Sequence, residues 1–477
     1  MCATASAAIV LTFNEGRLGR ASGHIAVWRA ASPVKGHEMP APASSSLAAQ
    51  PYWWDEAPLP RVPGTDLPRN VDVAVIGGGY AGLSAALTLA RAGRSVALFD
   101  RQRMGEGAST RNGGMTSGSI RPSLAELGRN FGEARAVAIV KEGKTAREDL
   151  YRFLDEEKIA CDFHLSGLFK GALNAADYEA LAREAEERRR LLGVDSVMVP
   201  RSEQHTYIGT DFYRGGSVRF DIGGLHPAKF LNGLLERVLA AGAGVHELTT
   251  VEKVERAAHG FTLSTSRGTL QARDLLVCTN GYADGADPWL RRRIVPVRSR
   301  IIVTEELTPE QMARAMPKRM MHVDSRKLSY YYRPSPDGRR ILFGGRDGTT
   351  TGDPHEPTDH LRAELERIFP ELAGIGLSHS WFGHVAMHRH MIPRIFVHGG
   401  IHYATGFCGS GVVWARWTAR KAALKLLGDA SEPPSAFEFE PPPAIPLYNG
   451  YPWFIPLAFA VYAAQDRRAM KKGERAA

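Results

Sequence analysis

Residues 71–100 read VDVAVIGGGYAGLSAALTLARAGRSVALFD, and this stretch decides the fold class. The apolar run at 71–76 is typical of a buried parallel strand. A glycine turn follows directly, then an Ala- and Leu-rich segment at 83–92 favours a helix, and a second strand is expected at 95–99. This order of strand, turn, helix and strand predicts a βαβ unit that binds a dinucleotide.

The glycine turn fits the pattern G-x-G-x-x-G, and each glycine has a mechanical reason. Gly77 permits the tight turn, Gly79 lets a pyrophosphate approach the backbone, and Gly82 lets the helix pack closely on the strand. The helix N-terminus offers N–H groups and a partial positive charge to that pyrophosphate. Asp100 ends the second strand, where a carboxylate accepts hydrogen bonds from a ribose hydroxyl and disfavours a 2′-phosphate. The alternative is a purely structural turn, but the complete ordered set favours a dinucleotide site.

Composition limits the class of protein. At 477 residues the chain is long enough for two intertwined domains, and its net charge of +9 is modest for that length. Its Lys and Arg residues form no run interleaved with aromatic residues, so we expect no nucleic-acid partner. The cysteines at 2, 161, 278 and 408 form no C-x-x-C pair, which argues against a disulfide framework or a metal site and suits a cytoplasmic location. No apolar run is long enough to span a bilayer, and we expect no membrane contact.

The two ends of the chain differ from its middle. Residues 1–50 are rich in small residues and lack sustained periodicity, so they are predicted to form a disordered extension. Near the other end, the apolar stretch 454–464 is too short to span a bilayer and is interpreted as a docked helix.

Between the ends, the pattern alternates between mixed αβ and β-rich segments. A glycine-rich loop at 105–114 would bring backbone N–H groups and one Arg onto a ligand phosphate or ring edge. A strand at 274–277 is expected in the same sheet as the first strand, and a second glycine-rich turn at 406–411 opens a late helix. Further helices are expected at 124–159, 175–192, 228–241, 361–368 and 412–427, and further strands at 301–303, 330–333, 340–346, 401–404 and in a segment ending at 251.

In this order the motifs resemble the FAD-dependent amine and amino-acid oxidoreductases, the family of D-amino-acid oxidase, glycine oxidase and monomeric sarcosine oxidase. Within it, they are most similar to the γ-glutamylputrescine oxidoreductases. The resemblance extends from about residue 52 into the C-terminal region. The residues that carry it are Gly77, Gly79, Gly82, Asp100, Ala108, Ser109, Arg111, Asn112, Gly113, Gly114, Gly224, His226, Pro227, 279–282, 296–298, 343–346, Gly406, Phe407, Gly409 and Gly411.

The resemblance implies a fold. We expect an α/β protein with an α+β substrate part, in which a Rossmann-like FAD-binding domain of the glutathione-reductase type is interleaved with a β-sheet-rich substrate domain of the D-amino-acid oxidase type. The expected FAD-binding domain is discontinuous and covers 51–135, 221–299 and 380–430. The substrate domain would cover 136–220 and 300–379, and 431–477 would form a C-terminal tail.

The resemblance also implies the cofactor, FAD. Its diphosphate would lie on the first glycine turn, its ribose at the acid after the second strand, and the pyrimidine end of its flavin at the second glycine turn. Val251 would contact the adenine through its backbone. The FAD-binding residues expected are Gly77, Gly79, Tyr80, Ala81, Gly82, Asp100, Arg101, Ser109, Arg111, Asn112, Gly113, Gly114, Val251, Thr279, Asn280, Gly281, Gly406, Phe407, Gly409 and Gly411.

Three residues are candidates for catalysis. Arg333 follows three tyrosines, and its guanidinium would clamp a substrate carboxylate while Tyr331 or Tyr332 closes the pocket. The alternative is a surface arginine on a hairpin, because 334–338 reads as a turn. His384 follows Trp-Phe-Gly and is expected to face the flavin. The nearby His388 and His390 show no metal-site pattern and are interpreted as structural.

The expected function is oxidation of the C–N bond of a primary or secondary amine, with transfer of a hydride to flavin N5 and hydrolysis of the imine. The substrate would be an amino acid, an N-substituted amino acid or a polyamine derivative such as γ-glutamylputrescine. Molecular oxygen or an electron-transfer or quinone partner would accept the electrons. Cys408 and Ser410 depart from the family pattern of the second glycine turn, which leaves substrate and acceptor open. The alternatives are an NAD(P)H-dependent flavin monooxygenase and a non-catalytic flavoprotein subunit.

Overall fold

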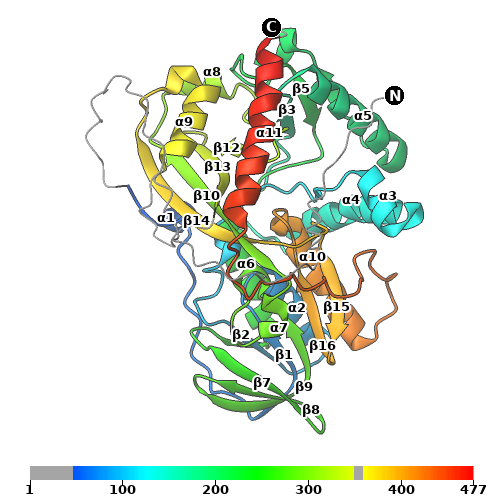
Figure 1. Ribbon diagram of the computed structural model, residues 1–477. Helices are drawn as coiled ribbons and strands as arrows, with labels where there is room; N and C mark the ends of the chain where they lie inside the picture. The colour runs from blue at the N-terminus through cyan, green and yellow to red at the C-terminus, as the bar shows by residue number, and fades with distance from the viewer. Residues whose placement is uncertain (1–46, 349–357, 476–477) are drawn as a thin grey trace, which may run out of the picture. The chain divides into compact units, whose positions relative to one another are not determined.

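Two eight-stranded sheets carry the fold in the computed structural model, which describes residues 47–348 and 358–475 (Figure 1). The predicted extension at 1–50 lies outside the described residues, apart from 47–50. The first sheet follows the αβ segments of the sequence, and the second follows the β-rich ones.

The first sheet contains the predicted βαβ unit. Strand β1 (Asn70–Ile76) leads through the glycine turn into helix α2 (Tyr80–Arg91), and β2 (Val96–Phe99) pairs with β1 in parallel. All of β2 and the centre of β1 are buried, as in a parallel sheet that is covered on both faces. The prediction for this stretch is confirmed.

Three strands of the first sheet end at the same edge. β9 (Gly268–Val277) pairs in parallel with β1, and β16 (Ile401–Thr405) pairs in parallel with β9. Helix α10 (Gly411–Leu427) follows β16 and packs against α2. The carboxyl ends of β1, β9 and β16 therefore lie together, as predicted for 274–277. The sheet order is β15-β16-β9-β1-β2-β6, with β7 and β8 attached beside β9; the remaining bounds are β6 (Gly244–His246), β7 (Val251–Ala257), β8 (Gly260–Thr265) and β15 (Arg394–His398).

The second sheet has the order β14-β10-β13-β12-β11-β3-β5-β4 and is antiparallel except where β11 pairs with β3. Alternate residues of its strands face opposite sides. Ile341 and Phe343 pack in a core with helix α9 (Asp359–Ile368), whereas Leu342 packs against Trp53. The strands are β3 (Leu168–Gly171), β4 (Val197–Val199), β5 (Gly216–Arg219), β10 (Val295–Thr304), β11 (Met321–Asp324), β12 (Tyr331–Pro334), β13 (Ile341–Gly348) and β14 (Leu377–Met387).

Two sequence expectations about elements differ from the structure, and three short strands were missed. The helix expected at 124–159 is two helices, because Gly132 adopts a φ of +83° between them. The strand expected to end at 251 is β6, which already ends at His246, and Val251 begins the next strand, β7. The three short strands β3, β4 and β5 were not anticipated. The helices not yet named are α1 (Trp53–Glu56), α3 (Leu124–Phe131), α4 (Glu133–Glu156), α5 (Ala175–Leu192), α6 (Pro227–Ala240), α7 (Pro288–Arg291) and α8 (Pro309–Ala315), with short 3₁₀ turns η1 (Ala108–Thr110), η2 (Arg201–Thr206), η3 (Asn280–Tyr282) and η4 (Pro370–Leu372).

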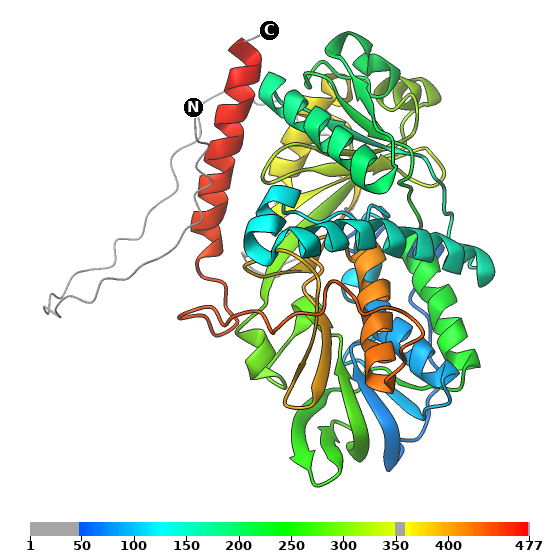
Figure 2. The same cartoon turned by 90° about the vertical axis from the view of Figure 1, so that its right-hand side faces the viewer.

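The chain closes with helix α11 (Ile455–Arg475), which runs beside the second sheet (Figures 1 and 2). Asp466 anchors it, since its carboxylate accepts hydrogen bonds from the backbone N–H groups of Lys327 and Leu328 at 2.7 and 3.0 Å. The prediction of a docked helix is confirmed, although the helix is longer than the apolar stretch. None of the helices described has the length and apolar character needed to cross a membrane.

The core of the second sheet contains an unusual histidine. His322 is fully buried, its ring stacks on Tyr332, and neither ring nitrogen has a hydrogen-bond partner among the described residues. Burial lowers the pKa of His322 to about 3, because a charged imidazole would lose its hydration there. The folded protein therefore keeps this ring neutral, whereas the unfolded chain protonates it near the ordinary pKa of 6.5.

The pH dependence of stability follows from this difference. Below pH 6.5 the unfolded chain binds one more proton at His322 than the folded chain, so the free energy of unfolding falls as the pH falls toward 3. We expect His322→Phe to reduce this slope by about 1.4 kcal/mol per pH unit. Urea unfolding at several pH values between about 7.5 and 5 would measure the slope of the free energy of unfolding against pH. Equal slopes for the variant and the unmodified protein would contradict the assignment.

Candidate functional site

The first glycine turn leaves no room for side chains. Gly77 has a φ of +110°, and a Cβ there would lie 2.9 Å from the backbone carbonyl of Cys278. A Cβ on Gly82 would collide with the carbonyl oxygen of Gly77, so this glycine lets α2 pack on the end of β1. The turn thus has the close helix–strand contact that a diphosphate-binding turn requires.

Two side chains hold the turn. Ser109 accepts a hydrogen bond from the backbone N–H of Tyr80 at 3.0 Å, at the first residue of α2. The Asp100 carboxylate accepts hydrogen bonds from the N–H groups of Gly78 at 2.6 Å and Gln102 at 2.8 Å. Burial raises the pKa of Asp100, while these two bonds act in the opposite direction. Each carboxylate oxygen retains a lone pair for a ribose hydroxyl.

The loop from Ala108 to Gly114 is held by tryptophans from distant parts of the chain. The indole N–H of Trp53 donates to the carbonyl of Asn112 at 2.8 Å, and that of Trp381 donates to the carbonyl of Arg111 at 3.0 Å. The indole N–H of Trp54 donates to the hydroxyl of Thr110 at 3.0 Å. Because the loop pairs with no long strand, these donors replace the bonds that a sheet would supply.

Arg333, from the second sheet, also holds the loop from Ala108 to Gly114. Its guanidinium is buried and donates to the carbonyls of Gly113 at 3.2 Å and Leu225 at 2.9 Å. Burial lowers the pKa of Arg333 to about 10. The alternative of a surface arginine is therefore wrong. The structure brings Arg333 to the predicted flavin loop, where its recorded hydrogen bonds go to backbone carbonyls.

The second glycine turn meets the end of β9 through Asn280. This residue adopts a φ of +49°, and its side-chain oxygen accepts a hydrogen bond from the N–H of Gly406 at 2.9 Å. Beside it, the hydroxyl of Thr279 is buried and has no hydrogen-bond partner among the described residues. A buried hydroxyl without a partner between two glycine turns fits a site for a phosphate or another polar ligand group. The residues present thus fit the expected FAD.

The structure places the other two predicted catalytic residues apart from Arg333. Tyr332 lies on the opposite face of β12, where its ring is fully buried and its hydroxyl bonds to that of Tyr213 at 2.8 Å. Tyr331, one residue earlier, shares the face of Arg333 because side chains alternate along a strand. His384 lies on β14, where its backbone N–H donates to the hydroxyl of Tyr282 at 3.2 Å. Burial lowers the pKa of His384, and nearby arginines lower it further, so its ring is neutral at pH 7.

The two neighbouring histidines have structural partners. His388 Nε2 bonds to the carbonyl of Ile392 at 2.6 Å, and burial lowers the pKa of His388 to about 3. His390 Nδ1 accepts a hydrogen bond from Arg394 at 2.7 Å. Both residues therefore stabilise the segment before the second glycine turn, in line with the structural interpretation.

Sequence reasoning missed a second group of residues. Arg346 lies on the same face of the second sheet as Tyr331, and it donates a hydrogen bond to the hydroxyl of Ser299 at 2.9 Å. That hydroxyl also bonds to the hydroxyl of Tyr331 at 3.1 Å. A Cβ on Gly409 would lie 2.9 Å from Arg346 Nη2, so the guanidinium reaches the second glycine turn. The two-residue alternation along β12 and β13 was the signal that could have identified this face.

Arg121 belongs to this group as well. Arg121 is exposed and Arg346 is half-buried, yet burial lowers the pKa of both guanidinium groups, to about 10 for Arg346. Both guanidinium groups lie near the second glycine turn and are partly desolvated. Their electrostatic neighbours include Cys408, whose pKa burial raises to about 12 and whose thiol is thus neutral. No carboxylate partner is recorded for either guanidinium within residues 47–348 and 358–475.

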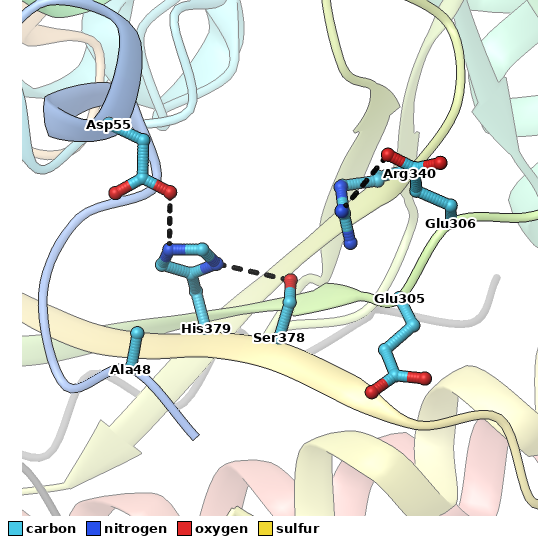
Figure 3. Close-up of a pocket in the computed structure, with 7 residues that line it drawn as sticks. All are labelled: Ala48, Asp55, Glu305, Glu306, Arg340, Ser378 and His379. Carbon is cyan, nitrogen blue, oxygen red and sulfur yellow. Dashed lines mark hydrogen bonds and ion pairs between the residues drawn. The ribbon is translucent and has the colours of Figure 1, made fainter. Parts of the chain in front are cut away.

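A separate cavity of about 570 Å³ lies elsewhere, between residues 48–55 and the facing ends of β10 and β14 (Figure 3). His379 lies between Asp55, at 2.9 Å, and the hydroxyl of Ser378, at 3.1 Å. Across the cavity, Arg340 pairs with Glu306 at 3.3 Å. These charged groups are satisfied by one another, so the cavity is not the candidate site.

Comparison with known proteins identifies what this arrangement resembles. A family model described as FAD dependent oxidoreductase matches residues 72–424. The probable oxidoreductase OrdL of Rhizobium meliloti is 32% identical, with 87% of this chain and 97% of the relative covered. The γ-glutamylputrescine oxidoreductase of Escherichia coli is 29% identical, with 83% and 93% covered. Among solved structures, glycine oxidase from Geobacillus kaustophilus has a TM-score of 0.62 at 20% identity and covers 74% of this chain and 93% of its own.

Asn280 provides a test of the link between the end of β9 and the second glycine turn. Asn280→Ala removes the acceptor for the Gly406 N–H and also strains a backbone with φ of +49°. Asn280→Gly removes the acceptor but tolerates that φ. We expect both variants to retain less flavin after purification, with a loss of affinity of roughly tenfold for the missing hydrogen bond. Flavin absorbance per protein measures this; full flavin content in Asn280→Gly would show that the acceptor does not matter.

Proposed function

The chain belongs to the family of FAD-dependent oxidoreductases, as its motifs predicted, and from this premise we propose which amine it oxidises. Family membership makes FAD its cofactor and makes the chain an amine or amino-acid oxidoreductase with the predicted α/β fold. The alternative of a non-catalytic subunit is thereby set aside. The proposed substrate is a primary or secondary amine that also carries a carboxylate.

The observation that supports this substrate is the pair Arg121 and Arg346. Both guanidinium groups lie beside the second glycine turn, and neither forms a salt bridge with a carboxylate in the described part of the chain. Desolvated guanidinium groups bind carboxylates strongly, because each hydrogen bond is charge-assisted. An anionic group on the substrate would complete a pairing that the described residues leave open.

The same charges favour the reactive form of the amine. A positive field from Arg121 and Arg346 disfavours an ammonium nearby and so lowers the pKa of a bound amine. Tyr331, whose pKa burial raises, stays neutral and presents its hydroxyl on the same face. These side chains would therefore favour a substrate that is anionic at one end and neutral at the amine nitrogen.

FAD, when bound, accepts a hydride equivalent from the carbon next to the amine nitrogen. The first glycine turn, with Asp100 and Ser109, would hold its diphosphate and ribose. The N-terminus of α10 would stabilise negative charge on the pyrimidine side, since its N–H groups and helix dipole follow Gly409 directly. Arg333 would keep the loop from Ala108 to Gly114 in place and would act as a positioning residue rather than as the substrate clamp.

Two of the relatives suggest the kind of amine. One is described as a γ-glutamylputrescine oxidoreductase and another as a glycine oxidase. Both substrates combine an amine with a carboxylate, as the arginine pair requires. We propose an amino acid, an N-substituted amino acid or a γ-glutamylated polyamine as substrate, with oxygen or a quinone-type partner as electron acceptor.

Anaerobic reduction of the bound flavin tests this function. The purified protein is mixed with γ-glutamylputrescine, putrescine, sarcosine, glycine and both enantiomers of several amino acids, and flavin absorbance is followed. We expect bleaching by an amine with a carboxylate and little by putrescine, which has none. Admission of air then distinguishes oxygen from another acceptor by the rate of reoxidation. Bleaching by NADPH alone would instead establish the monooxygenase alternative.

Substitution of Arg346 tests the carboxylate contact. We expect Arg346→Gln to raise KM for the carboxylate substrate roughly 10- to 100-fold, because a charge-assisted hydrogen bond contributes about 1.5–3 kcal/mol. KM for the same amine with a carboxamide in place of the carboxylate should change less than about threefold, since the amide forms only a weaker neutral bond. Steady-state kinetics with both compounds gives the comparison.

A matched control separates this effect from general loss of charge. Arg183→Gln removes an exposed arginine from α5 and should leave both KM values unchanged. Arg346→Lys keeps the charge and should recover part of the affinity for the carboxylate substrate. An equal rise of KM for carboxylate and carboxamide in Arg346→Gln would rule out a carboxylate contact at this residue.

A further inference from the structure

Four large apolar side chains project from the segment before and at the start of α11. Leu447, Tyr451, Trp453 and Leu457 have exposed fractions of 80%, 66%, 53% and 69%. They lie within eleven consecutive positions, 447–457, whereas the other exposed large apolar side chains of the described chain are scattered. A gathering of this kind on a folded surface indicates a binding function.

The segment that carries these side chains is fixed to the protein. The buried Tyr448 donates its hydroxyl to the carbonyl of Ile294 at 2.9 Å, and the N–H of Ile445 donates to the carbonyl of Arg292 at 3.0 Å. The indole N–H of Trp453 donates to the carbonyl of Leu447 at 3.2 Å, within the segment itself. The apolar side chains therefore project into solvent from a loop whose backbone is held in place.

The segment itself carries no charge, and two arginines lie at its base. No charged residue occurs between Glu440 and Asp466, so the projecting loop is uncharged. Directly beside it lie the exposed Arg291 and Arg292; the first packs against Gly450 and the second bonds to the loop through its backbone. An apolar tip that includes Trp and Tyr, with arginines at its base, matches the apolar interior and anionic headgroups of a lipid surface.

We propose that Leu447, Tyr451, Trp453 and Leu457 insert into the surface of an anionic membrane, while Arg291 and Arg292 contact its headgroups. The contact is interfacial, because none of the helices described could span a bilayer. No membrane contact is expected from the sequence, because no apolar run is long enough to span a bilayer; the exposure of these side chains is a property of the folded chain. Lipid is favoured over a second copy of the chain because the arginines at the base call for an anionic partner.

Vesicle binding by the full-length flavoprotein tests the proposal. The protein is centrifuged with vesicles of phosphatidylglycerol and phosphatidylethanolamine, and separately with vesicles of phosphatidylcholine alone. We expect clear co-sedimentation with the anionic vesicles and much less with the neutral ones. Joint substitution of Leu447, Tyr451, Trp453 and Leu457 by Ser should weaken partitioning by roughly 100-fold or more. Joint Arg291→Gln and Arg292→Gln substitution should weaken binding to anionic vesicles by about fivefold for each charge and leave neutral vesicles unaffected.

The control exchanges equally exposed apolar residues elsewhere. Leu165→Ser, Phe220→Ser and Leu248→Ser together remove side chains exposed by 56%, 54% and 63% and should leave vesicle binding unchanged. Flavin content and anaerobic reduction should be the same in all variants, which shows that each is folded. Failure of the unmodified protein to bind anionic vesicles overturns the proposal, as does equal binding by the four-residue Ser variant. A change from dimer to monomer in that variant, without vesicle binding, assigns the surface to a second copy instead.

Discussion

The loop from Ala108 to Gly114 depends on side chains for its shape, and the site depends on the loop. Its backbone groups pair with no long strand, so indole N–H groups and one buried guanidinium satisfy them. Trp53 comes from the start of the described chain, Arg333 from the second sheet and Trp381 from its edge. The loop is therefore held by side chains from both parts of the fold, and we expect the loss of any of these donors to disturb cofactor binding.

A second constraint is the parallel pairing of β1, β9 and β16. It brings two glycine turns that are far apart in the chain to one edge of the first sheet, and Asn280, which follows β9, forms a hydrogen bond with the second turn. Two helix N-termini thus approach the same region, from α2 and from α10. Both carry partial positive charge, and Arg121 and Arg346 add full charges. This accumulated positive charge suits a dianionic cofactor and a substrate with a carboxylate.

Sequence patterns identified residues well where the geometry is local. The turn around Gly77 and Gly82 was predicted because strand, turn and helix follow one another in the chain. The choice of Tyr332 over Tyr331 could not be made in that way, since both fit a strand and only the sheet decides which face meets the site. Likewise the break at Gly132 was missed, because a helix pattern tolerates a single glycine until the fold requires a bend.

The sequence by itself determined the family, the cofactor and the βαβ unit, because these rest on short motifs whose spacing is fixed by the backbone. Only the tertiary structure decided that Arg121 and Arg346 lie near each other, since they come from distant segments of the chain. It also decided that Arg333 supports a loop and that Trp453 projects outward. Burial and exposure are properties of the packed chain, because the same residue type occurs in buried and in exposed positions.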